Sequence, residues 1–411
     1  MSIALKFNNT FVGKSTCTGC EACSQICAHH AITFHEDNEG FRYPNVNQDL
    51  CTECGICDKI CPIDNPVSKY KVINKAFGGY IKDDKIRENS TSGGAFSAIV
   101  DSWCDKNYVI FGALTDGISV KHDFIDDKQI LDKFRKSKYS QSKIGYSYIK
   151  VKEFLREGKK VLFSGTPCQI AGLRSYLKDK EYNGNLLTIE VICEGVPSPL
   201  YIRKMKESYS KKGKGDIIYI DYRYKDNYKW DFEVMKIKTL LSSFDNAIFK
   251  TFKYDRWFNP FWSIWLQHLM SRPSCYTCPF TTNERVADIT LGDLWGVHIY
   301  CPELYGNNGG SSLIICNTDK GLDALTKAKN LMFGHDLDYK TALKYQGPLR
   351  KHIDYNEKRP EFIRDLCSYM SFEEINKKWA IKPSFALIWH KYVWGNRQNV
   401  WWWRVKKHLK I

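Results

Sequence analysis

Two runs of closely spaced cysteines near the start of the chain constrain its structure more than any other feature. The spacing C-x2-C-x2-C-x3-C occurs at Cys17, Cys20, Cys23 and Cys27, and again at Cys51, Cys54, Cys57 and Cys61. A repeat of this kind predicts two copies of one supersecondary unit. Three thiolates spaced by two residues share one loop and can bind three corners of one metal cluster, so we expect this segment to bind metal.

The spacing also predicts which cysteines share a cluster. In two-cluster iron–sulfur domains with such runs, the fourth cysteine of each run ligates the other cluster. This assigns one cluster to Cys17, Cys20, Cys23 and Cys61, and the other to Cys51, Cys54, Cys57 and Cys27. A pair of zinc sites is the alternative, although zinc needs only four ligands per site and has no use for the crossing arrangement.

Residues 1–68 resemble a bacterial-type 2[4Fe-4S] ferredoxin, which implies an α+β, ferredoxin-like N-terminal domain. Ile32–Phe34 and Phe41–Tyr43 flank Asn38-Glu39-Gly40 and predict a short hairpin. One departure from the pattern is Ala28, which stands where a proline usually follows the fourth cysteine; Cys61 is followed by Pro62.

Composition limits the possible class and location of the protein. With 411 residues and 43% hydrophobic content, the chain can form two or three folded domains. It shows neither a secretory signal nor an apolar run of about 18 residues, so we expect a cytoplasmic protein with reduced cysteines. The net charge of +15 raises the question of nucleic-acid binding, but no nucleic-acid-binding motif accompanies the basic residues, and we expect no such partner.

After a polar linker at residues 65–74, apolar runs alternate with helical patterns and predict an α/β domain. The expected strands are Tyr108–Leu114, Lys160–Phe163 and Leu186–Ile192, and the expected helices are Gly94–Trp103 and Ile170–Leu177. Ligands bind at the carboxyl ends of strands in such folds, which draws attention to the turn at Ser164–Cys168.

A third set of cysteines follows these strands. Cys168 and Cys193 each come after an expected strand, and Cys275 and Cys278 form a further C-x2-C pair, so the four could hold a third cubane cluster. A zinc site or unrelated thiols are the alternatives. The remaining cysteines stand singly and are expected to be small buried hydrophobes: Cys104, Cys301, Cys316 and Cys367.

A family resemblance rests on motifs that occur in a fixed order. These are Ser92-Gly93-Gly94, Ser137-Lys-Tyr-Ser140, Gly165-Thr-Pro-Cys-Gln169, Cys193-Glu-Gly-Val-Pro-Ser198, Cys275-Tyr-Thr-Cys278, Arg285 to Gly296 and Gly310-Ser-Ser312. They resemble the coenzyme F420 hydrogenase/dehydrogenase beta-subunit family over about residues 76–325, and we place the domain at 76–350. The resemblance implies FAD and a [4Fe-4S] cluster on Cys168, Cys193, Cys275 and Cys278, which would bring the total to three clusters.

The same resemblance implies which residues contact FAD: Ser92, Gly93, Gly94, Lys138, Tyr139, Ser140, Gln141, Thr166, Gly292 and Asp293. Glycines before a helix let the backbone approach a pyrophosphate, and the helix N-terminus favours its charge. The glycines could equally mark an ordinary helix start, and Lys138 could be a solvated charge.

Two further segments are candidate parts of the site. Arg223, Lys225 and Arg285 could bind an anionic substrate, or they could be surface charges on a strand. Between Ala247 and Met270, aromatic residues recur at helical spacing and predict a helix that packs in the core or covers the flavin.

Residues 351–411 form a basic, tryptophan-rich tail, which we expect to be mostly helical. Ser371-Phe-Glu-Glu374 predicts the start of a helix, and Trp389, Trp394, Trp401, Trp402 and Trp403 follow it. Tryptophan beside lysine suits a membrane interface, so peripheral membrane contact is one hypothesis. Packing against the main domain or a partner subunit is the other.

Together these features predict an FAD- and iron–sulfur-dependent oxidoreductase that passes electrons between a ferredoxin or similar donor and an organic substrate. Relatives with this layout suggest a sugar-linked or lipid-linked substrate in surface-polysaccharide biosynthesis. The alternatives are an F420-dependent oxidoreductase and a non-catalytic electron-relay subunit of a larger complex. No catalytic acid or base is assigned.

Overall fold

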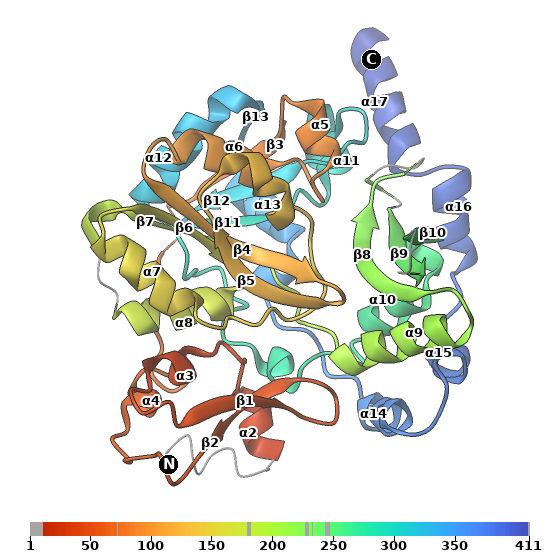
Figure 1. The fold of residues 1–411 in the computed structure, drawn as a ribbon. Helices are drawn as coiled ribbons and strands as arrows, with labels where there is room; N and C mark the ends of the chain where they lie inside the picture. Colours follow the sequence, from red (N-terminus) through yellow and green to blue (C-terminus); the bar gives the residue numbers. More distant parts are fainter. Residues whose placement is uncertain are drawn as a thin grey trace.

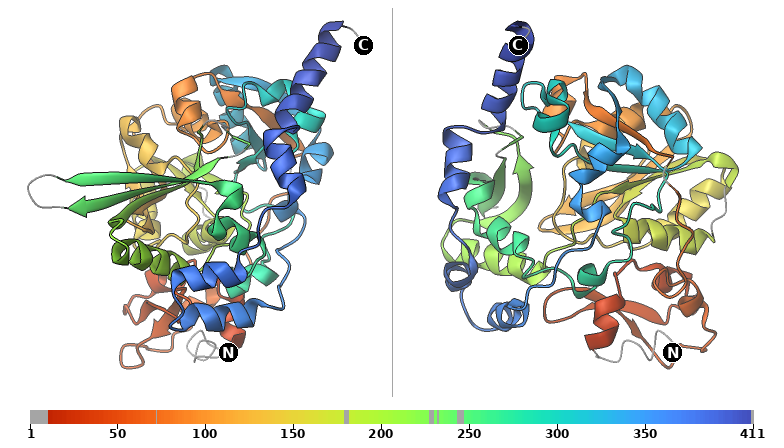
Figure 2. Two further views of the ribbon diagram at one scale, coloured as in Figure 1. Left: turned by 90° about the vertical axis from the view of Figure 1, so that its right-hand side faces the viewer. Right: turned by 180° about the vertical axis from the view of Figure 1, so that it is seen from behind.

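The computed structural model describes residues 11–71, 73–178, 182–226, 230–231, 233–242 and 247–409. An N-terminal domain lies below a large mixed sheet, and a smaller sheet stands beside that sheet (Figure 1). The C-terminal helices run along the outer side of the smaller sheet, and the last of them projects away from the body of the protein (Figure 2).

The N-terminal domain contains the predicted hairpin, in which β1 (Ile32–Glu36) pairs antiparallel with β2 (Arg42–Val46). Its short helices are α2 (Phe11–Thr16), α3 (Ala22–Ile26) and α4 (Ile56–Lys59).

The cysteine repeat is visible in the backbone of these two loops. Gly19 and Glu53 occupy equivalent positions in the two runs, and both have a positive φ, 69° and 54°. Glu21 and Gly55, also equivalent, have φ angles of 60° and 66°. Two non-glycine residues thus adopt the left-handed conformation that their glycine counterparts adopt easily. The two loops therefore turn in the same way, as the repeat predicts.

An eight-stranded sheet forms the centre of the protein, in the order β13-β3-β12-β11-β7-β6-β4-β5. β4, β6, β7 and β11 are parallel to one another, and the other pairings are antiparallel. The strands are β3 (Lys75–Ile81), β4 (Tyr108–Asp116), β5 (Ser119–Ile125), β6 (Lys160–Gly165), β7 (Leu186–Val191), β11 (Ile289–Asp293), β12 (Ser312–Cys316) and β13 (Met332–Leu337). The three strands expected from the sequence are present as β4, β6 and β7.

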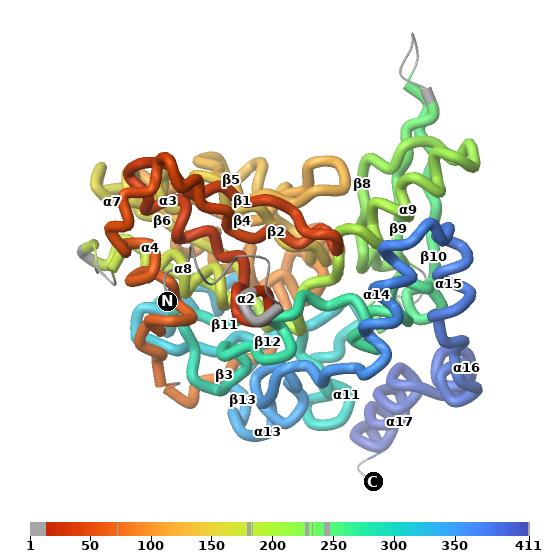
Figure 3. Tube along the Cα trace, turned by 90° about the horizontal axis from the view of Figure 1, so that it is seen from below, coloured from red at the N-terminus to blue at the C-terminus, as the bar shows by residue number. Residues whose placement is uncertain are grey.

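Helices cover both faces of this sheet. α6 (Ala95–Trp103) and α12 (Asp319–Ala328) pack on one face. α7 (Ser147–Arg156) and α8 (Pro167–Leu177) pack on the other, the face toward the N-terminal domain (Figures 1 and 3). Both expected helices are therefore present. The remaining short helices around the sheet are α5 (Asp84–Glu88), α11 (Val297–Tyr300) and α13 (Tyr339–Lys344).

Short 3-10 segments connect many of these elements. They are η1 (Lys128–Phe134), η2 (Tyr182–Gly184), η3 (Arg256–Phe258), η4 (Pro273–Thr277), η5 (Pro302–Tyr305), η6 (Lys329–Leu331) and η7 (Gly347–Leu349).

The smaller sheet contains β8 (Asp216–Tyr224), β9 (Val234–Ser242) and β10 (Ile248–Asp255) in antiparallel order. It packs with α9 (Pro199–Lys211) and α10 (Pro260–Leu266). The expectation of one aromatic helix between residues 247 and 270 is wrong in its first part, because β10 occupies residues 248–255. The helical part is α10, and its aromatic side chains, Phe261, Trp262 and Trp265, are buried in the core, as one of the two hypotheses stated.

Ser68 and Tyr70 of the expected linker make hydrogen bonds to the central domain. Tyr70 pairs with Arg285 through backbone hydrogen bonds, and Arg174 donates to the Ser68 carbonyl at 2.8 Å. This segment therefore attaches the end of the N-terminal domain to the central sheet.

The C-terminal region is helical, as expected. It contains α14 (Arg359–Cys367), α15 (Phe372–Trp379), α16 (Phe385–Tyr392) and α17 (Asn396–Leu409). Ser371 and Glu374 form the predicted capping box of α15. In the part of the chain that the structure describes, no helix combines the length and the apolar character needed to cross a bilayer.

Candidate functional site

The first predicted ligand set lies around one cavity. Cys17, Cys20, Cys23 and Cys61 line it together with apolar side chains that include Phe34 and Pro44. The four sulfurs are close enough for the charges of Cys17, Cys20 and Cys61 to raise the pKa of the Cys23 thiol, after burial, which has the larger effect. Cys61 comes from the second run, so cysteines of both runs lie around this cavity, and ligation of one cluster by these four stays a prediction.

The second predicted set is less completely gathered. Cys27 and Cys57 pack against the same small core as Cys23. Burial and then Asp58 raise the pKa of Cys57 to about 11, and Cys54 also contributes. Cys54 itself is exposed. Only one member of this set is therefore exposed, and ligation by Cys27, Cys51, Cys54 and Cys57 stays a prediction.

The third set meets where three segments of the central domain end. Cys168 lies in the first turn of α8, Cys193 follows β7, and Cys275 and Cys278 lie on and after η4. Burial and then the charges of Cys275 and Cys168 raise the pKa of Cys193, with Cys278 also acting on it. Gly195 turns the chain here with φ +96°, and a Cβ at this residue would lie 3.2 Å from the Cys275 Cβ. The four cysteines are therefore neighbours, as the cluster hypothesis requires.

The chemistry of these thiols fits an iron–sulfur cluster. Burial raises the pKa of Cys275 to about 11 and that of Cys278 to about 12, so several thiolates would be costly here without a compensating cation. Among the described residues, no three His, Cys, Asp or Glu side chains are placed to hold a single metal ion. In a cubane each thiolate binds a different iron atom, so its ligands lie farther apart than those of one ion.

The predicted FAD residues lie along one rim of the central domain, at the carboxyl ends of the parallel strands. Ser92 donates to the Ser311 carbonyl, and the Gly93 amide donates to Ser312 Oγ at 2.9 Å. A Cβ at Gly93 would lie 2.5 Å from the Gly79 carbonyl oxygen. In this structure, close packing of the loop on β3 and β12 is therefore what requires glycine at this position.

The Lys138–Gln141 segment continues this rim toward the N-terminal domain. Lys138 Nζ donates to three carbonyls at the end of η1, and burial lowers its pKa to about 7. Tyr139 packs edge-on against Trp262 and Trp265. Gln141 donates to the Thr18 carbonyl at 2.7 Å, and Ser140 and Gln141 both line a pocket against the hairpin. Lys138 is therefore not the solvated charge of the alternative hypothesis, and Gln141 joins the two domains.

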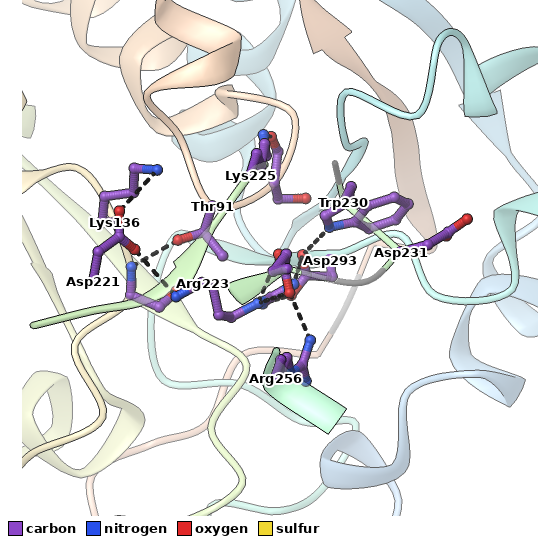
Figure 4. A network of polar contacts seen from close by, with 12 residues as sticks. Thr91, Lys136, Asp221, Arg223, Lys225, Trp230, Asp231, Arg256 and Asp293 are labelled. Carbon is purple, nitrogen blue, oxygen red and sulfur yellow. Dashed lines mark hydrogen bonds and ion pairs between the residues drawn. The ribbon is translucent and has the colours of Figure 1, made fainter. Parts of the chain in front are cut away.

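Thr166, Gly292 and Asp293 complete the predicted set. Thr166 Oγ1 lies 3.2 Å from Cys168 Sγ. Gly292 packs against Ile192. Asp293 ends β11 and accepts two hydrogen bonds from Arg223 (Figure 4). Burial acts to raise the pKa of Asp293, but Arg223 outweighs it, and the net pKa lies below its ordinary value.

The three residues suggested for substrate binding make contacts within the protein. Arg223 is buried and pairs with Glu233 and with Asp293. The pair with Asp293 is visible in Figure 4. Lys225 donates to the carbonyls of Arg87, Ser92 and Gly309, and burial lowers its pKa to about 7. Arg285 is 2% exposed and pairs with Glu190. These are not surface charges on a strand, and a substrate role for them stays a prediction.

Sequence reasoning missed two cations beside the Ser92–Gly94 loop. Gly94, the N-cap of α6, provides no side-chain hydrogen bond to the first turn of the helix. Arg135 Nε donates to Ser97 Oγ in that turn at 3.0 Å, and Lys136 Nζ lies 3.3 Å from Asp221. Both residues directly precede the Ser137–Ser140 motif, which was the available signal. An uncapped helix N-terminus beside an arginine fits a pyrophosphate.

The lone cysteines divide into two kinds. Cys104, Cys301 and Cys316 are buried, as predicted. Cys367 is exposed, so the prediction is wrong for this residue, which lies at the end of α14.

Two family models match parts of the chain. Residues 158–332 match the model for the C terminus of the coenzyme F420 hydrogenase/dehydrogenase beta subunit, and residues 16–65 match a 4Fe-4S dicluster domain. A chain in a solved structure of the F420-reducing [NiFe] hydrogenase complex from Methanosarcina barkeri is similar over 77% of this chain and 92% of its own length, with 16% identity and a TM-score of 0.41. No curated protein matches the chain.

The two family matches establish an iron–sulfur protein of the electron-transfer type. The residues of the first cysteine set lie within the dicluster match, and the four central cysteines lie within the other match. The chain therefore joins a 4Fe-4S dicluster domain, at residues 16–65, to a module of the coenzyme F420 hydrogenase/dehydrogenase beta-subunit family, at residues 158–332.

Proposed function

We propose that this chain is an iron–sulfur flavoprotein oxidoreductase that passes electrons from a ferredoxin-type donor to an organic substrate through three [4Fe-4S] clusters and FAD. One observation carries the proposal: Cys20 of the first set packs against α8, the helix that carries Cys168 of the central set. A Cβ at Gly172 of α8 would lie 3.2 Å from Cys20 Sγ, and α8 carries Cys168 in its first turn. Clusters in these sets would be adjacent, which suits transfer of single electrons between them.

The protein's own groups support a flavin at the rim. The α6 N-terminus and Arg135 would hold the pyrophosphate, and the other predicted FAD residues would contact the rest of the cofactor along the same rim. FAD would supply the exchange between single electrons and the two-electron chemistry of an organic substrate. Thr166, beside Cys168, would lie between the flavin rim and the central cluster.

The finer assignments of substrate and location belong to the same proposal. A sugar-linked or lipid-linked substrate in surface-polysaccharide biosynthesis is consistent with the C-terminal helices. α16 and α17 carry no acidic residue, and they and the turn between them expose Phe385, Trp389, Trp394, Trp401 and Trp402. Aromatic and basic side chains of this kind favour the surface of an anionic membrane.

A non-catalytic electron-relay subunit is the second candidate. It is favoured by Arg223 and Arg285, which are engaged by carboxylates inside the protein. The relay would contain the clusters and form a stable complex with a larger partner, yet it would not turn over a substrate alone. The F420-dependent alternative predicts stoichiometric reduction of F420 by the purified protein.

Anaerobic purification with counting of iron, sulfide and flavin tests the proposal. We expect about twelve irons and one FAD per chain. Eight irons without flavin would contradict the central cluster and the flavin. Such a result would still agree with two clusters in the N-terminal domain. Zinc in place of iron would contradict the whole proposal.

A further inference from the structure

One buried arginine lies between the first cysteine set and the central cysteine set. Arg272 directly precedes η4, the segment that carries Cys275, and its side chain is 1% exposed. The side chain reaches into the N-terminal domain, where Nε donates to the Cys17 carbonyl at 2.9 Å and Nη2 donates to the Arg42 carbonyl at 3.0 Å. The backbone of Arg272 therefore lies in the central domain, while its guanidinium contacts the N-terminal domain.

The guanidinium is held in one position. Nη1 donates to Gln141 Oε1 at 2.8 Å, and the group lies 4.2 Å from the centre of the Tyr43 ring. Nη2 also lies 3.9 Å from Cys17 Sγ, within reach of a weak N–H···S hydrogen bond. A group fixed by this many contacts keeps its distance to the sulfur.

Cysteine side chains lie near Arg272. Arg272 is in no ion pair of the described residues, and neither is the buried Arg87, whereas Arg223, Arg256, Arg285 and Arg359 pair with acids. Burial acts to lower the pKa of Arg272, but the charges of Tyr43, Cys17, Cys275 and Cys168 outweigh it, so the net pKa lies above its ordinary value. A buried cation without an anion is unfavourable, so these cysteines, as cluster ligands, are the anions that would compensate it.

We propose that Arg272 raises the reduction potential of both the Cys17-Cys20-Cys23-Cys61 cluster and the central cluster, and so draws electrons inward from the Cys51 side. The inference rests on the proposed cluster assignment. A buried positive charge and a hydrogen bond to a ligand sulfur both stabilise the reduced state, which carries one more negative charge. The hydrogen bonds of Arg272 go to Cys17, Gln141 and Arg42, whereas Cys54 of the other set is exposed.

The electron transfer balances one electron at a time. With the clusters bound, a reduced one-electron donor protein would give one electron to the cluster on Cys27, Cys51, Cys54 and Cys57 and would itself be oxidised. That electron would pass to the cluster on Cys17, Cys20, Cys23 and Cys61 and then to the central cluster, and each donor would return to its oxidised state. No covalent bond forms or breaks. Arg272 influences the transfer through its charge and takes no part in a chemical step.

The test is a redox titration of the full-length, anaerobically purified chain, followed by electron paramagnetic resonance. In Arg272→Gln we expect two of the three midpoint potentials to shift to more negative values and the third to stay unchanged. In Arg272→Lys, which keeps the charge but loses the fork of donors, both shifts should be smaller. Arg174→Gln is the matched control, because Arg174 is also buried and joins the two domains through Ser68 and Val286. It should leave all three potentials unchanged.

The outcomes separate this inference from the proposed function. Wild-type protein without three cluster signals would contradict the cluster assignment itself. Wild-type clusters with unchanged potentials in both Arg272 variants would overturn only the inference. Loss of about four irons in both variants would also overturn it, because Arg272 would then be a structural support of the Cys17 loop. A shift of equal size in Arg174→Gln would do the same.

Discussion

Gly172 lies against Cys20 so closely that a Cβ at residue 172 would be 3.0 Å from the Cys20 Cβ and 3.2 Å from its Sγ. The same Cβ would lie 3.0 Å from the Tyr148 hydroxyl, which donates to the Cys20 carbonyl. Glycine inside a helix costs about 1 kcal/mol relative to alanine. Its presence in the middle of α8 is therefore explained by the close approach of the cysteine loop.

Replacement of this glycine should damage the contact between the two domains. Gly172→Ala gains about 1 kcal/mol of helix propensity, but overpacking a buried contact costs about 1–3 kcal/mol. We expect a lower melting temperature and faster loss of iron in Gly172→Ala, with larger effects in Gly172→Val. Thermal unfolding and iron release under a chelator measure both. Gly347→Ala is the control, because Gly347 is exposed and has open space around its Cα. Equal iron loss in the two alanine variants would contradict the argument.

The central cysteines should bind iron independently of the dicluster domain. Cys275→Ser removes one of four neighbouring thiols, so we expect about four irons fewer per chain and an unchanged signal from the other clusters. Cys367→Ser is the matched control, because Cys367 is exposed and lies outside all three sets. Iron analysis of both variants checks the prediction, which fails if Cys275→Ser retains the wild-type content.

The cysteine sets were predictable because their spacing is a local property of the sequence. The repeat places Gly19, Glu21, Glu53 and Gly55 in equivalent turns, and strand ends place Cys168 and Cys193. Arg272 was not predictable, since its significance lies in contacts with Cys17 and Arg42, which are more than 200 residues away. β10 was not predicted from the sequence. The helical spacing of the aromatic residues in α10 was assumed to continue toward the N-terminus, into a strand whose side chains alternate only weakly between more and less exposed positions.

The flavin rim shows the same limit. The motifs identified Ser92–Gly94 and Lys138–Gln141, but the contacts that decide their roles are long-range. Lys138 is engaged by carbonyls of η1, whereas Arg135, which no motif included, lies at the α6 N-terminus. The sequence motifs therefore identified the segments that form the rim. They did not show which basic side chain along it lies at the α6 N-terminus.

The buried network around Arg223 should contribute strongly to stability. Arg223 joins Glu233, which is 0% exposed, to Asp293 at the end of β11. Removing one partner from a buried ion pair costs about 3–5 kcal/mol, because the remaining charge stays buried. We expect Arg223→Met to lose about 3 kcal/mol, at the lower end, since Arg256 still pairs with Glu233 and Trp230 with Asp293. Denaturant unfolding measures the loss, with Asp354→Ala in an exposed pair as the control that should change little.

Lys138 should make stability depend on pH in the neutral to basic range. Burial lowers its pKa from the ordinary 10.5 to about 7 in the folded protein. Between these values the unfolded chain binds a proton that the folded chain does not, so stability rises with pH across this window. Lys138→Met removes the difference, and its curve of melting temperature against pH should rise less steeply from about pH 7 to 10. Lys133→Met, at an exposed position of η1, controls for the loss of a surface charge. Parallel curves for wild type and Lys138→Met would contradict the prediction.

The C-terminal helices should bind anionic membranes through their exposed aromatic side chains. Trp401 and Trp402 are 56% and 46% exposed on α17, next to Lys406 and Lys407 in its last turn. Trp379 differs, because it is buried at 8% and its indole donates to Asp365. Tryptophan prefers the bilayer interface, and each nearby lysine adds about 1 kcal/mol on anionic lipid. We therefore expect Trp401→Ser/Trp402→Ser to reduce flotation with phosphatidylserine vesicles, while wild-type binding falls at high salt.

Truncation gives the sharper version of this experiment. A chain cut after residue 380 keeps α15, whose Ile375 and Trp379 belong to the core of the smaller sheet, and removes only α16 and α17. This truncated chain should unfold close to the wild-type temperature and should not float with the vesicles. If it floats as well as the full chain, the binding surface lies elsewhere. If it instead unfolds at a much lower temperature, the two helices serve mainly to stabilise the fold, consistent with the ion pair between Lys391 and Asp255, and the exposed tryptophans would then need another partner.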